Sequence, residues 1–343
     1  MSEYLLEVKN LRTSFFTDNG EVKAVNGVSF NLAKGKVLGI VGESGSGKSV
    51  TAYSILQILQ YPGKTIGGEI LFHGQDLLQL NEKEMQKIRG DKISIIFQDP
   101  MTSLNPVFTI GNQIEEAIKL HTDRRGDAMH KRAIELLRLV GINEPERRIK
   151  QYPFEFSGGM RQRAMIAMAL ACEPDLLIAD EPTTALDVTI QAQIIELIQD
   201  LQKKLGMAVI MITHDLGVIA DISDEILVMY AGSICERGSS EDIFYHPRHA
   251  YTRGLLHSIP KQQKSSERLI PIAGNPVDLL NLPPGCAFAP RCKEAMKICL
   301  REHPEEMAMG GEHYASCWLN VREVWQKAQE SAGKSAAGSL EEG

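Results

Sequence analysis

Short apolar runs separated by polar turns predict a mixed α/β fold. Alternating or β-branched residues predict three strands near the start of the chain, at residues 5–16, 22–32 and 36–41. Shorter and almost wholly apolar runs predict strands that are buried on both faces, at residues 93–97, 176–179 and 208–212. Together these segments indicate an α/β core of the size that binds a nucleotide.

Helical periodicity occupies the segments between these strands. A glycine-rich turn at residue 42 leads into a helical pattern over residues 48–57. Residues 111–171 are expected to be mostly helical, with apolar spacing at Ala133, Leu136, Leu137 and Val140. We therefore expect a helical insertion that separates two parts of one sheet, followed by short elements over residues 215–258.

The C-terminal part differs in composition. A polar segment at 261–267 predicts a linker, and the residues after it are rich in Pro, Gly and Cys but poor in periodicity. Such a loop-dominated unit needs a cross-link or a metal to hold it. We predict an ATPase-sized domain at 1–258 with a helical subdomain at about 100–171, a small domain at 259–320, and a disordered tail at 321–343.

Composition and charge narrow the class of protein. The 343 residues are 43% hydrophobic and 24% charged, which is typical of soluble globular proteins, and no apolar run is long enough to span a membrane. The first residues lack the basic and apolar segments of an export signal, so we expect a reducing cytosolic compartment. A net charge of −7 argues against a dedicated nucleic-acid binder.

The most informative motif is a phosphate-binding loop. A G-x-x-x-x-G-K-S sequence follows a predicted strand and opens a predicted helix; it consists of Gly42, Glu43, Ser44, Gly45, Ser46, Gly47, Lys48 and Ser49. Glycines let consecutive backbone N–H groups surround phosphates, and the helix directs its positive end at them. We expect Lys48 to reach the β- and γ-phosphate oxygens and Ser49 to bind Mg²⁺.

Two adjacent carboxylates end the apolar run 176–179. Side chains alternate between the faces of a strand, so Asp180 and Glu181 are expected to have different roles. Asp180 suits the Mg²⁺ shell, and Glu181 suits the general base that orients and deprotonates the attacking water.

A second turn of anion-binding type opens a later helix. Ser157, Gly158 and Gly159 precede a helical segment and direct a hydroxyl and backbone N–H groups at one point. In isolation such a turn is equally well explained as a helix N-cap. Because the chain has one nucleotide fold but two anion-binding helix starts, we expect each to complete a site on a partner chain.

These motifs, in this order and spacing over residues 3–255, resemble the ATP-binding cassette ATPases. The resemblance implies a P-loop NTPase fold with a RecA-like core, an antiparallel β subdomain and a helical subdomain. It also implies that two cassettes pack head to tail, with each ATP between the phosphate loop of one and the Ser-Gly-Gly signature of the other. It implies that Val50 and the rest of the loop bind nucleotide, that Gln98 contacts Mg²⁺ and the attacking water, and that Asp187 belongs to the D-loop at 184–187. It also implies that His214 contacts the γ-phosphate and that Phe15, or alternatively Phe16, stacks on adenine.

Further segments resemble one subgroup of that family, the ATPases of bacterial oligopeptide and dipeptide importers. They are residues 97–106, the His-Pro-Arg-His-Ala-Tyr sequence at 246–251, and the cysteine-rich C-terminus. The resemblance implies a peripheral subunit at the cytoplasmic face of the membrane, two transmembrane permeases, a second and related ATPase, and an extracytoplasmic peptide-binding protein. The cargo stays open between peptides and a small solute such as a nickel chelate.

Four of the six cysteines lie close together in the sequence, at Cys286, Cys292, Cys299 and Cys317. Their Cys-x5-Cys-x6-Cys-x17-Cys spacing lacks the C-x-x-C pair typical of tetrahedral zinc. Four widely spaced thiolates suit a larger group, and a [4Fe–4S] cluster fits that description, as the importer resemblance also implies. Zinc and free thiols are the alternatives, whereas a reducing compartment disfavours disulfides.

Two rival functions are considered. A soluble DNA-repair ATPase of the same family would also pair the fold with cysteine-bound zinc, but residues 286–317 contain more acidic than basic side chains and no cationic patch. A translation-associated cassette protein would carry two cassettes in one chain, and the sequence shows no internal repeat. The sequence therefore favours an importer ATPase.

Overall fold

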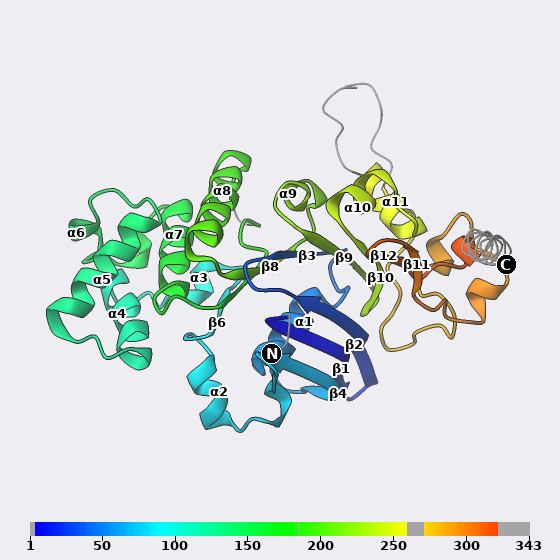
Figure 1. The fold of residues 1–343 in the computed structure, drawn as a ribbon, viewed down its shortest axis with the longest axis horizontal. Helices are drawn as coiled ribbons and strands as arrows, with labels where there is room; N and C mark the ends of the chain where they lie inside the picture. The colour runs from blue at the N-terminus through cyan, green and yellow to red at the C-terminus, as the bar shows by residue number, and fades with distance from the viewer. Residues whose placement is uncertain (1–3, 185, 259–270, 322–343) are drawn as a thin grey trace, which may run out of the picture.

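The computed structural model describes residues 4–184, 186–258 and 271–321. The expected linker at 261–267, the tail from residue 322 and Ala185 of the expected D-loop lie outside the described residues. Figure 1 shows a long central sheet between two layers. Above it lie α8 (Val188–Leu205), α9 (Leu216–Ala220), α10 (Ser240–Tyr245) and α11 (Ala250–His257), and below it lie α1 (Lys48–Leu56) and a smaller sheet.

The smaller sheet is antiparallel, with strand order β2-β1-β4-β5. Its strands are β1 (Leu6–Thr17), β2 (Gly20–Leu32), β4 (Gly63–Phe72) and β5 (Gln75–Asp76). The sequence predicted β1 and β2 closely but not β4, because Gly67 and Gly68 interrupt it and few of its side chains are buried. This sheet is the antiparallel β subdomain expected from the family resemblance.

The central sheet has the order β11-β12-β10-β9-β3-β8-β7-β6. Its parallel part consists of β6 (Ile93–Ile96), β7 (Leu176–Asp180), β8 (Ala208–Thr213), β3 (Val37–Val41) and β9 (Glu225–Tyr230). The apolar runs that predicted buried strands are confirmed as β6, β7 and β8. Parallel strands bring their carboxyl ends to one edge, which is where the expected catalytic residues follow β3, β7 and β8.

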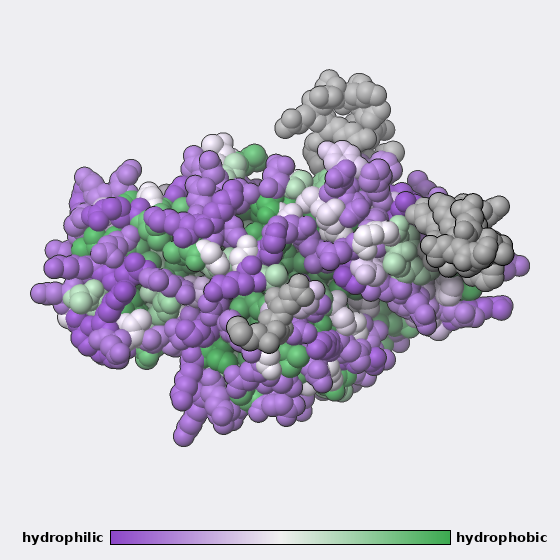
Figure 2. Space-filling view, in the orientation of Figure 1, coloured by the Kyte–Doolittle hydropathy of each residue, from purple (hydrophilic) through white to green (hydrophobic). Residues whose placement is uncertain are grey.

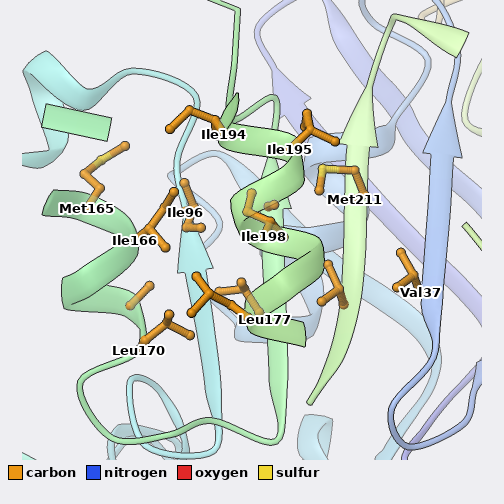
Figure 3. Packing of buried hydrophobic residues seen from close by; sticks show 14 of the residues in the cluster. Val37, Ile96, Met165, Ile166, Leu170, Leu177, Ile194, Ile195, Ile198 and Met211 are labelled. Atoms are coloured by element: carbon orange, nitrogen blue, oxygen red, sulfur yellow. The ribbon is translucent and has the colours of Figure 1, made fainter. Parts of the chain in front are cut away.

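Both faces of this sheet are buried. Val37 and Val41 of β3 face one apolar core, whereas Leu38 and Ile40 of the same strand face the other. Figure 3 shows Ile198 of α8 packed over the strands in the first of these cores. Because successive strand residues point to opposite faces, a strand between two cores must be apolar throughout.

The remaining helices confirm the expected helical insertion between β6 and β7. They are α3 (Pro100–Ser103), α4 (Ile110–His121), α5 (Gly126–Leu139), α6 (Pro145–Arg148) and α7 (Gly158–Ala169), while α2 (Glu82–Ile88) precedes β6. Ala133, Leu136 and Leu137 are buried on α5, as their spacing predicted, and Val140 caps its end. These helices group at the left of Figure 1.

The C-terminal segment continues the central sheet through β12 (His313–Ala315), which pairs with the antiparallel strand β10 (Ser233–Gly238), and then β11 (Met307–Gly310). Three single-turn helices at Ala289–Arg291, Ile298–Leu300 and Trp318–Asn320 make up much of the rest. The segment is loop-rich, as expected, but it is not set apart from the cassette. Phe288 is buried in the same core as Ile198 because β10 offers an edge to which the segment can bind.

Hydrophilic residues cover most of the face in Figure 2, with apolar patches between them. Among the described residues no helix has both the length and the apolar composition needed to cross a bilayer.

Candidate functional site

The phosphate loop joins β3 to α1, and its glycines are required by close backbone contacts. Gly47 has φ of 100°, and a Cβ placed there would lie 2.4 Å from the carbonyl oxygen of Ala24. Gly42 has φ of 154°, and its Cβ would lie 2.2 Å from the carbonyl oxygen of Met229. Residues with side chains would push the loop away from its neighbours at both positions.

Lys48 closes the loop from inside. Its Nζ donates hydrogen bonds to the carbonyl oxygens of Gly42, at 2.8 Å, and Glu43, at 3.0 Å. The side chain is buried, and this burial lowers the pKa of the amine from its ordinary value. The first helical residue thus keeps its amino group at the loop where phosphates are expected.

Ser49 and Asp180 meet as predicted for a magnesium site. Ser49 Oγ donates to Asp180 Oδ1 at 2.8 Å. Asp180 Oδ2 is buried with no hydrogen-bond partner among the described residues, and burial raises the pKa of this carboxyl. A buried carboxylate oxygen without a partner, beside a hydroxyl, is the kind of oxygen donor set that Mg²⁺ takes. These residues therefore fit the ion.

Glu181 contacts three side chains, of which Gln98 and His214 come from distant parts of the sequence and Thr184 from the turn that follows it. Gln98 Nε2 and Thr184 Oγ1 each donate to Glu181 Oε2 at 2.8 Å. His214 Nδ1 lies 3.4 Å from Glu181 Oε1. Glu181 is only 14% exposed, so these groups hold a largely buried carboxylate next to the magnesium residues. Gln98 contacts Glu181 here, and its predicted contact with Mg²⁺ stays a prediction.

Asp180 and Glu181 differ for a reason that the sequence argument missed. Strand β7 ends at Asp180, and Glu181 has a left-handed backbone with φ of 48°. Its N–H donates to the carbonyl oxygen of Ile212 at 2.9 Å, which ties the turn to β8. The chain turns at this residue, so the two carboxylates separate through the turn rather than through strand alternation. A non-glycine residue with positive φ at such a place is typical of a functional site.

Comparison with known proteins agrees with this geometry. A family model described as "ABC transporter" matches residues 25–184, and one described as "Oligopeptide/dipeptide transporter, C-terminal region" matches residues 235–299. The chain is 54% identical over 318 residues to the Dipeptide transport ATP-binding protein DppD of Bacillus subtilis, which covers 92% of this chain and 95% of the relative. The chain belongs to the ATP-binding proteins of oligopeptide and dipeptide ABC transporters.

Other members and one solved structure support the same assignment. The Oligopeptide transport ATP-binding protein OppD of Escherichia coli is 50% identical over 323 residues, covering 94% of this chain and 95% of the relative. The structure titled "Dimeric structure of a post-hydrolysis state of the ATP-binding cassette MJ0796 bound to ADP and Pi" matches with a TM-score of 0.62 and 30% identity. It covers 68% of this chain and 98% of that chain, so the expected cassette fold is confirmed.

The signature of this ABC protein lies with its helical subdomain. Ser157 caps α7, where its side chain accepts a hydrogen bond from the N–H of Met160. A Cβ on Gly159 would lie 2.9 Å from Ile190 of α8, so the turn packs against that helix. In Figure 1, α7 lies well apart from α1, which begins at the phosphate loop. Asp187 caps α8 by accepting from Ile190 N at 3.1 Å, and its predicted role toward nucleotide stays a prediction.

The predicted adenine-stacking residues lie on β1. Phe15 is half-buried and its ring lies against Gly63, where a Cβ would come within 2.8 Å of it. Phe16 is 47% exposed. Thr13 of the same strand hydrogen-bonds to Ser54 at 2.8 Å, which holds β1 beside α1. The strand is thus near the helix that follows the phosphate loop, and the stacking role stays a prediction.

The four C-terminal cysteines of this ABC protein line one small cavity, Cys286, Cys292, Cys299 and Cys317. None of these four cysteines is in a disulfide bond in the structure. Burial raises the pKa of the Cys286 thiol to about 11 and also raises the pKa values of the Cys292 and Cys317 thiols. In the described part of the chain no three His, Cys, Asp or Glu residues are grouped closely enough to hold one metal ion.

Proposed function

We infer that this ABC ATPase hydrolyses ATP to drive the uptake of peptides through partner permeases. The observation that carries the inference is the joint arrangement of Glu181 with Gln98 and His214, directly beside the Ser49–Asp180 pair. The relatives named above are peptide transport proteins, which supports the cargo class. A nickel chelate or another small solute is the alternative cargo.

The side chains divide the work of hydrolysis. The backbone of the loop and Lys48 bind the phosphates, and Ser49 with Asp180 holds the metal ion. Mg²⁺, when bound, neutralises the charge that develops on the phosphate oxygens. Glu181 accepts the proton of the attacking water, while Gln98 and His214 fix the position of its carboxylate and of the water. Thr184 donates to the same oxygen of this carboxylate as Gln98 does.

We propose that the complete ATP site forms between this chain and a second, related ATPase. Support comes from the position of α7, which places Ser157 away from this chain's own phosphate loop. The same turn would then serve the nucleotide held by the partner. An extracytoplasmic binding protein that delivers peptide, and a position at the cytoplasmic face of the membrane, complete the proposed assembly.

We propose that the permeases contact the apolar surface beside Gln98. Met101 and Val107 are 61% and 70% exposed, and Phe108 and Leu120 border a depression of about 370 Å³ on α4. Glu115, Glu116 and Lys119 line the same depression and leave it with a net negative charge, so a permease helix with apolar and basic side chains fits it. Phe108→Asp should abolish co-purification with the permeases without lowering the thermal stability of the isolated subunit, and unchanged co-purification would contradict this surface.

We propose that the four cysteines hold a [4Fe–4S] cluster with a structural role. All four line one small cavity, which supports a single group shared by the four thiols. Protein purified without oxygen should contain about four iron atoms per chain and absorb broadly in the visible range. Stoichiometric zinc without iron would refute the cluster.

Transport in a reconstituted system tests the proposed function. The ATPase should co-purify with two polytopic membrane proteins, and vesicles that contain the whole assembly should accumulate labelled peptide only when ATP is supplied on the ATPase side. Vesicles with Glu181→Gln serve as the matched control, since this variant retains the ATP-binding residues. Uptake of nickel but not peptide would replace the cargo, and a stable soluble complex with DNA would reject the transporter role.

A further inference from the structure

The phosphate loop is bound from outside the cassette by an arginine of the C-terminal segment. Arg291 Nη1 donates to Glu43 Oε2 at 2.6 Å, and its Nη2 donates to Glu43 Oε1 at 3.0 Å. Glu43 is the second residue of the loop. The arginine side chain is only 5% exposed, so this two-bond pair is largely removed from water. Paired bonds between guanidinium and carboxylate are among the strongest and most directional in proteins.

Contacts outside the loop also hold the guanidinium group of Arg291. It also donates to the carbonyl oxygens of Ile272 and Ala273, at 3.3 and 3.1 Å, and to the hydroxyl of Tyr230 at 3.3 Å. These partners lie in the C-terminal segment and on β9, and none belongs to the loop. Glu43 is the main reason that the pKa of Arg291 is raised, so the cation is permanent. The orientation of Arg291 is therefore set independently of the loop that it holds.

A second contact holds the backbone of the same loop residue. The N–H of Glu43 donates to the hydroxyl of Tyr251 at 2.8 Å. Tyr251 is fully buried on α11, and its own N–H donates to His249 Nδ1 at 3.0 Å. The rings of Tyr251, Tyr230 and Phe288 pack together with centroids about 5 Å apart. The tyrosine thus has little freedom to move with the loop.

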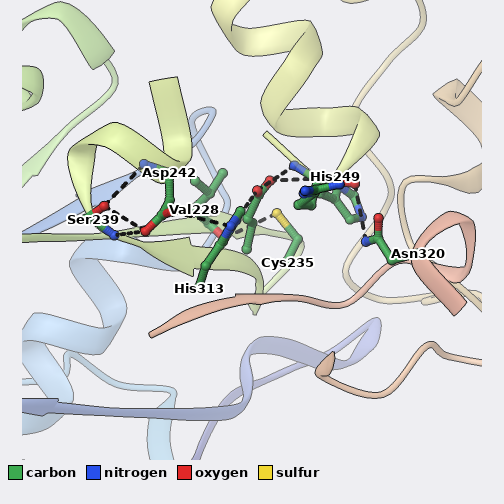
Figure 4. A network of polar contacts seen from close by, with 9 residues as sticks. Val228, Cys235, Ser239, Asp242, His249, His313 and Asn320 are labelled. Carbon is green, nitrogen blue, oxygen red and sulfur yellow. Dashed lines mark hydrogen bonds and ion pairs between the residues drawn. The ribbon is translucent and has the colours of Figure 1, made fainter. Parts of the chain in front are cut away.

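The start of α11 is held in turn by Glu236 of β10. Its carboxylate accepts from Arg248 N at 2.6 Å, from His249 N at 2.9 Å and from His313 Nε2 at 2.9 Å. Figure 4 shows His249 and His313 in this network. Since His313 lies on β12, the same carboxylate joins the C-terminal segment to the helix that carries Tyr251. This explains structurally what the His-Pro-Arg-His-Ala-Tyr segment does in the fold.

We propose that Arg291 is a positioning residue for ATP binding, which acts on the phosphate loop through Glu43. The side chain of Glu43 binds Arg291 and its backbone N–H binds Tyr251, and both partners lie outside the loop. Glu43 is therefore the residue through which the C-terminal segment holds the loop in its binding conformation. The proposal rests on the role of the loop in ATP binding. ATP affinity then depends on a contact that lies outside the nucleotide-binding motifs themselves.

The test compares nucleotide binding by full-length variants. Arg291→Gln should raise the Kd for ATP, measured by calorimetry, about 5-fold or more, which is the lower end of typical coupling between sites. In the assembled transporter the KM for ATP should rise while kcat at saturating ATP stays near the wild-type value, because the loop is reached but the Glu181 group is untouched. Arg291→Lys should recover part of the affinity, since one of the two bonds can form.

Glu43→Gln and a matched control separate positioning from general stability. Glu43→Gln should raise the Kd similarly, and the double variant should be no worse than either single one, because both remove the same contact. Arg253→Gln removes another arginine–glutamate pair, which joins α11 to Glu294 of the C-terminal segment and does not contact the loop, and it should leave the Kd unchanged.

Each outcome decides the proposal. Wild-type affinity in Arg291→Gln, with normal thermal unfolding, would overturn it. Equal losses of affinity in Arg291→Gln and Arg253→Gln would also overturn it, because a structural role of the segment would then suffice. A wild-type protein that fails to bind ATP would instead refute the role of the loop, which is a separate failure.

Discussion

Two buried carboxylates of the central sheet have opposite surroundings. At the carboxyl end of β7, Asp180 Oδ2 is buried without a hydrogen-bond partner among the described residues. At the antiparallel edge, the equally buried carboxylate of Glu236 accepts from three donors. A buried polar group without a partner is costly, so it persists where a ligand supplies the partner. The region around Asp180 is therefore suited to bind a ligand, whereas the region around Glu236 stabilises the fold.

The largest expected effect concerns the ligand-binding region around Asp180 and Glu181. Glu181→Gln should slow ATP hydrolysis about 10²- to 10⁴-fold, the usual contribution of a general base, because the amide does not accept the proton of water. ATP binding should persist, since Lys48, Ser49 and Asp180 are unchanged. Steady-state phosphate release and nucleotide binding measure the two effects. Glu173→Gln, which alters an exposed carboxylate paired with Arg132, is the control and should leave both unchanged.

Normal hydrolysis by Glu181→Gln would end the distinction drawn for Glu181. The carboxylate would then be a structural group like Glu236, and the base would have to be sought elsewhere at the carboxyl ends of the strands.

The next largest effect concerns the region around Glu236. Glu236→Ala leaves two backbone N–H groups and His313 buried without their acceptor, which should lower the free energy of unfolding by about 3 kcal/mol. Urea unfolding of the subunit measures this loss. Glu236→Gln keeps an acceptor oxygen and should lose clearly less. Equal stability of Glu236→Ala and the wild type would show that this network contributes little to stability. The contrast between the carboxylates of Glu236 and Asp180 would then be lost.

The smallest expected effect is a gain in stability, the opposite of the loss expected for Glu236→Ala. Burial raises the pKa of Asp180, so its contribution to stability is complete below the ordinary value of 3.8 and is lost as the pH rises through the raised value. At pH 7 the ionised carboxylate therefore costs stability, and Asp180→Asn should raise the Tm measured without nucleotide. The gain should shrink as the pH falls toward 4. A lower Tm for Asp180→Asn at pH 7 would show that the Asp180 carboxylate stabilises the protein, as that of Glu236 does, and would contradict this prediction.

The same variant should lose the stabilisation that Mg²⁺ and ATP give to the wild-type protein. The asparagine keeps an oxygen for Ser49 but has no charge for the ion. Thermal unfolding with and without both ligands measures this loss. Unchanged stabilisation would remove Asp180 from the metal site.

The sequence predicted those parts of the site whose chemistry is local. The loop at residues 42–49, the carboxylates after β7 and His214 after β8 each follow an apolar strand, so their position in the fold could be inferred from the chain order. The parallel strands were predicted for the same reason, since strands buried on both faces are continuously apolar. Strand β4 was missed because its glycines and exposed residues leave no such pattern.

The contacts that were missed depend on turns and tertiary pairing, which leave no pattern in the sequence. Thr184 was expected only within the D-loop, and its bond to Glu181 depends on the turn that begins after β7. Arg291 and Glu43 are separated by 248 positions, and neither residue type nor spacing signals such a pair. The C-terminal segment was expected as a domain of its own because its composition differs, yet composition does not show that β12 hydrogen-bonds to β10.

The pairing of β12 with β10 also bears on how the protein avoids aggregation. Without it, β10 would present a free row of N–H and C=O groups, and such an edge can recruit strands of other molecules. The short strands β12 and β11 replace that edge with a smaller one. Since the covering residues are made long after β10 during synthesis, the nascent cassette carries an open edge until its last segment arrives. Loss of the segment would therefore threaten solubility as well as ATP binding.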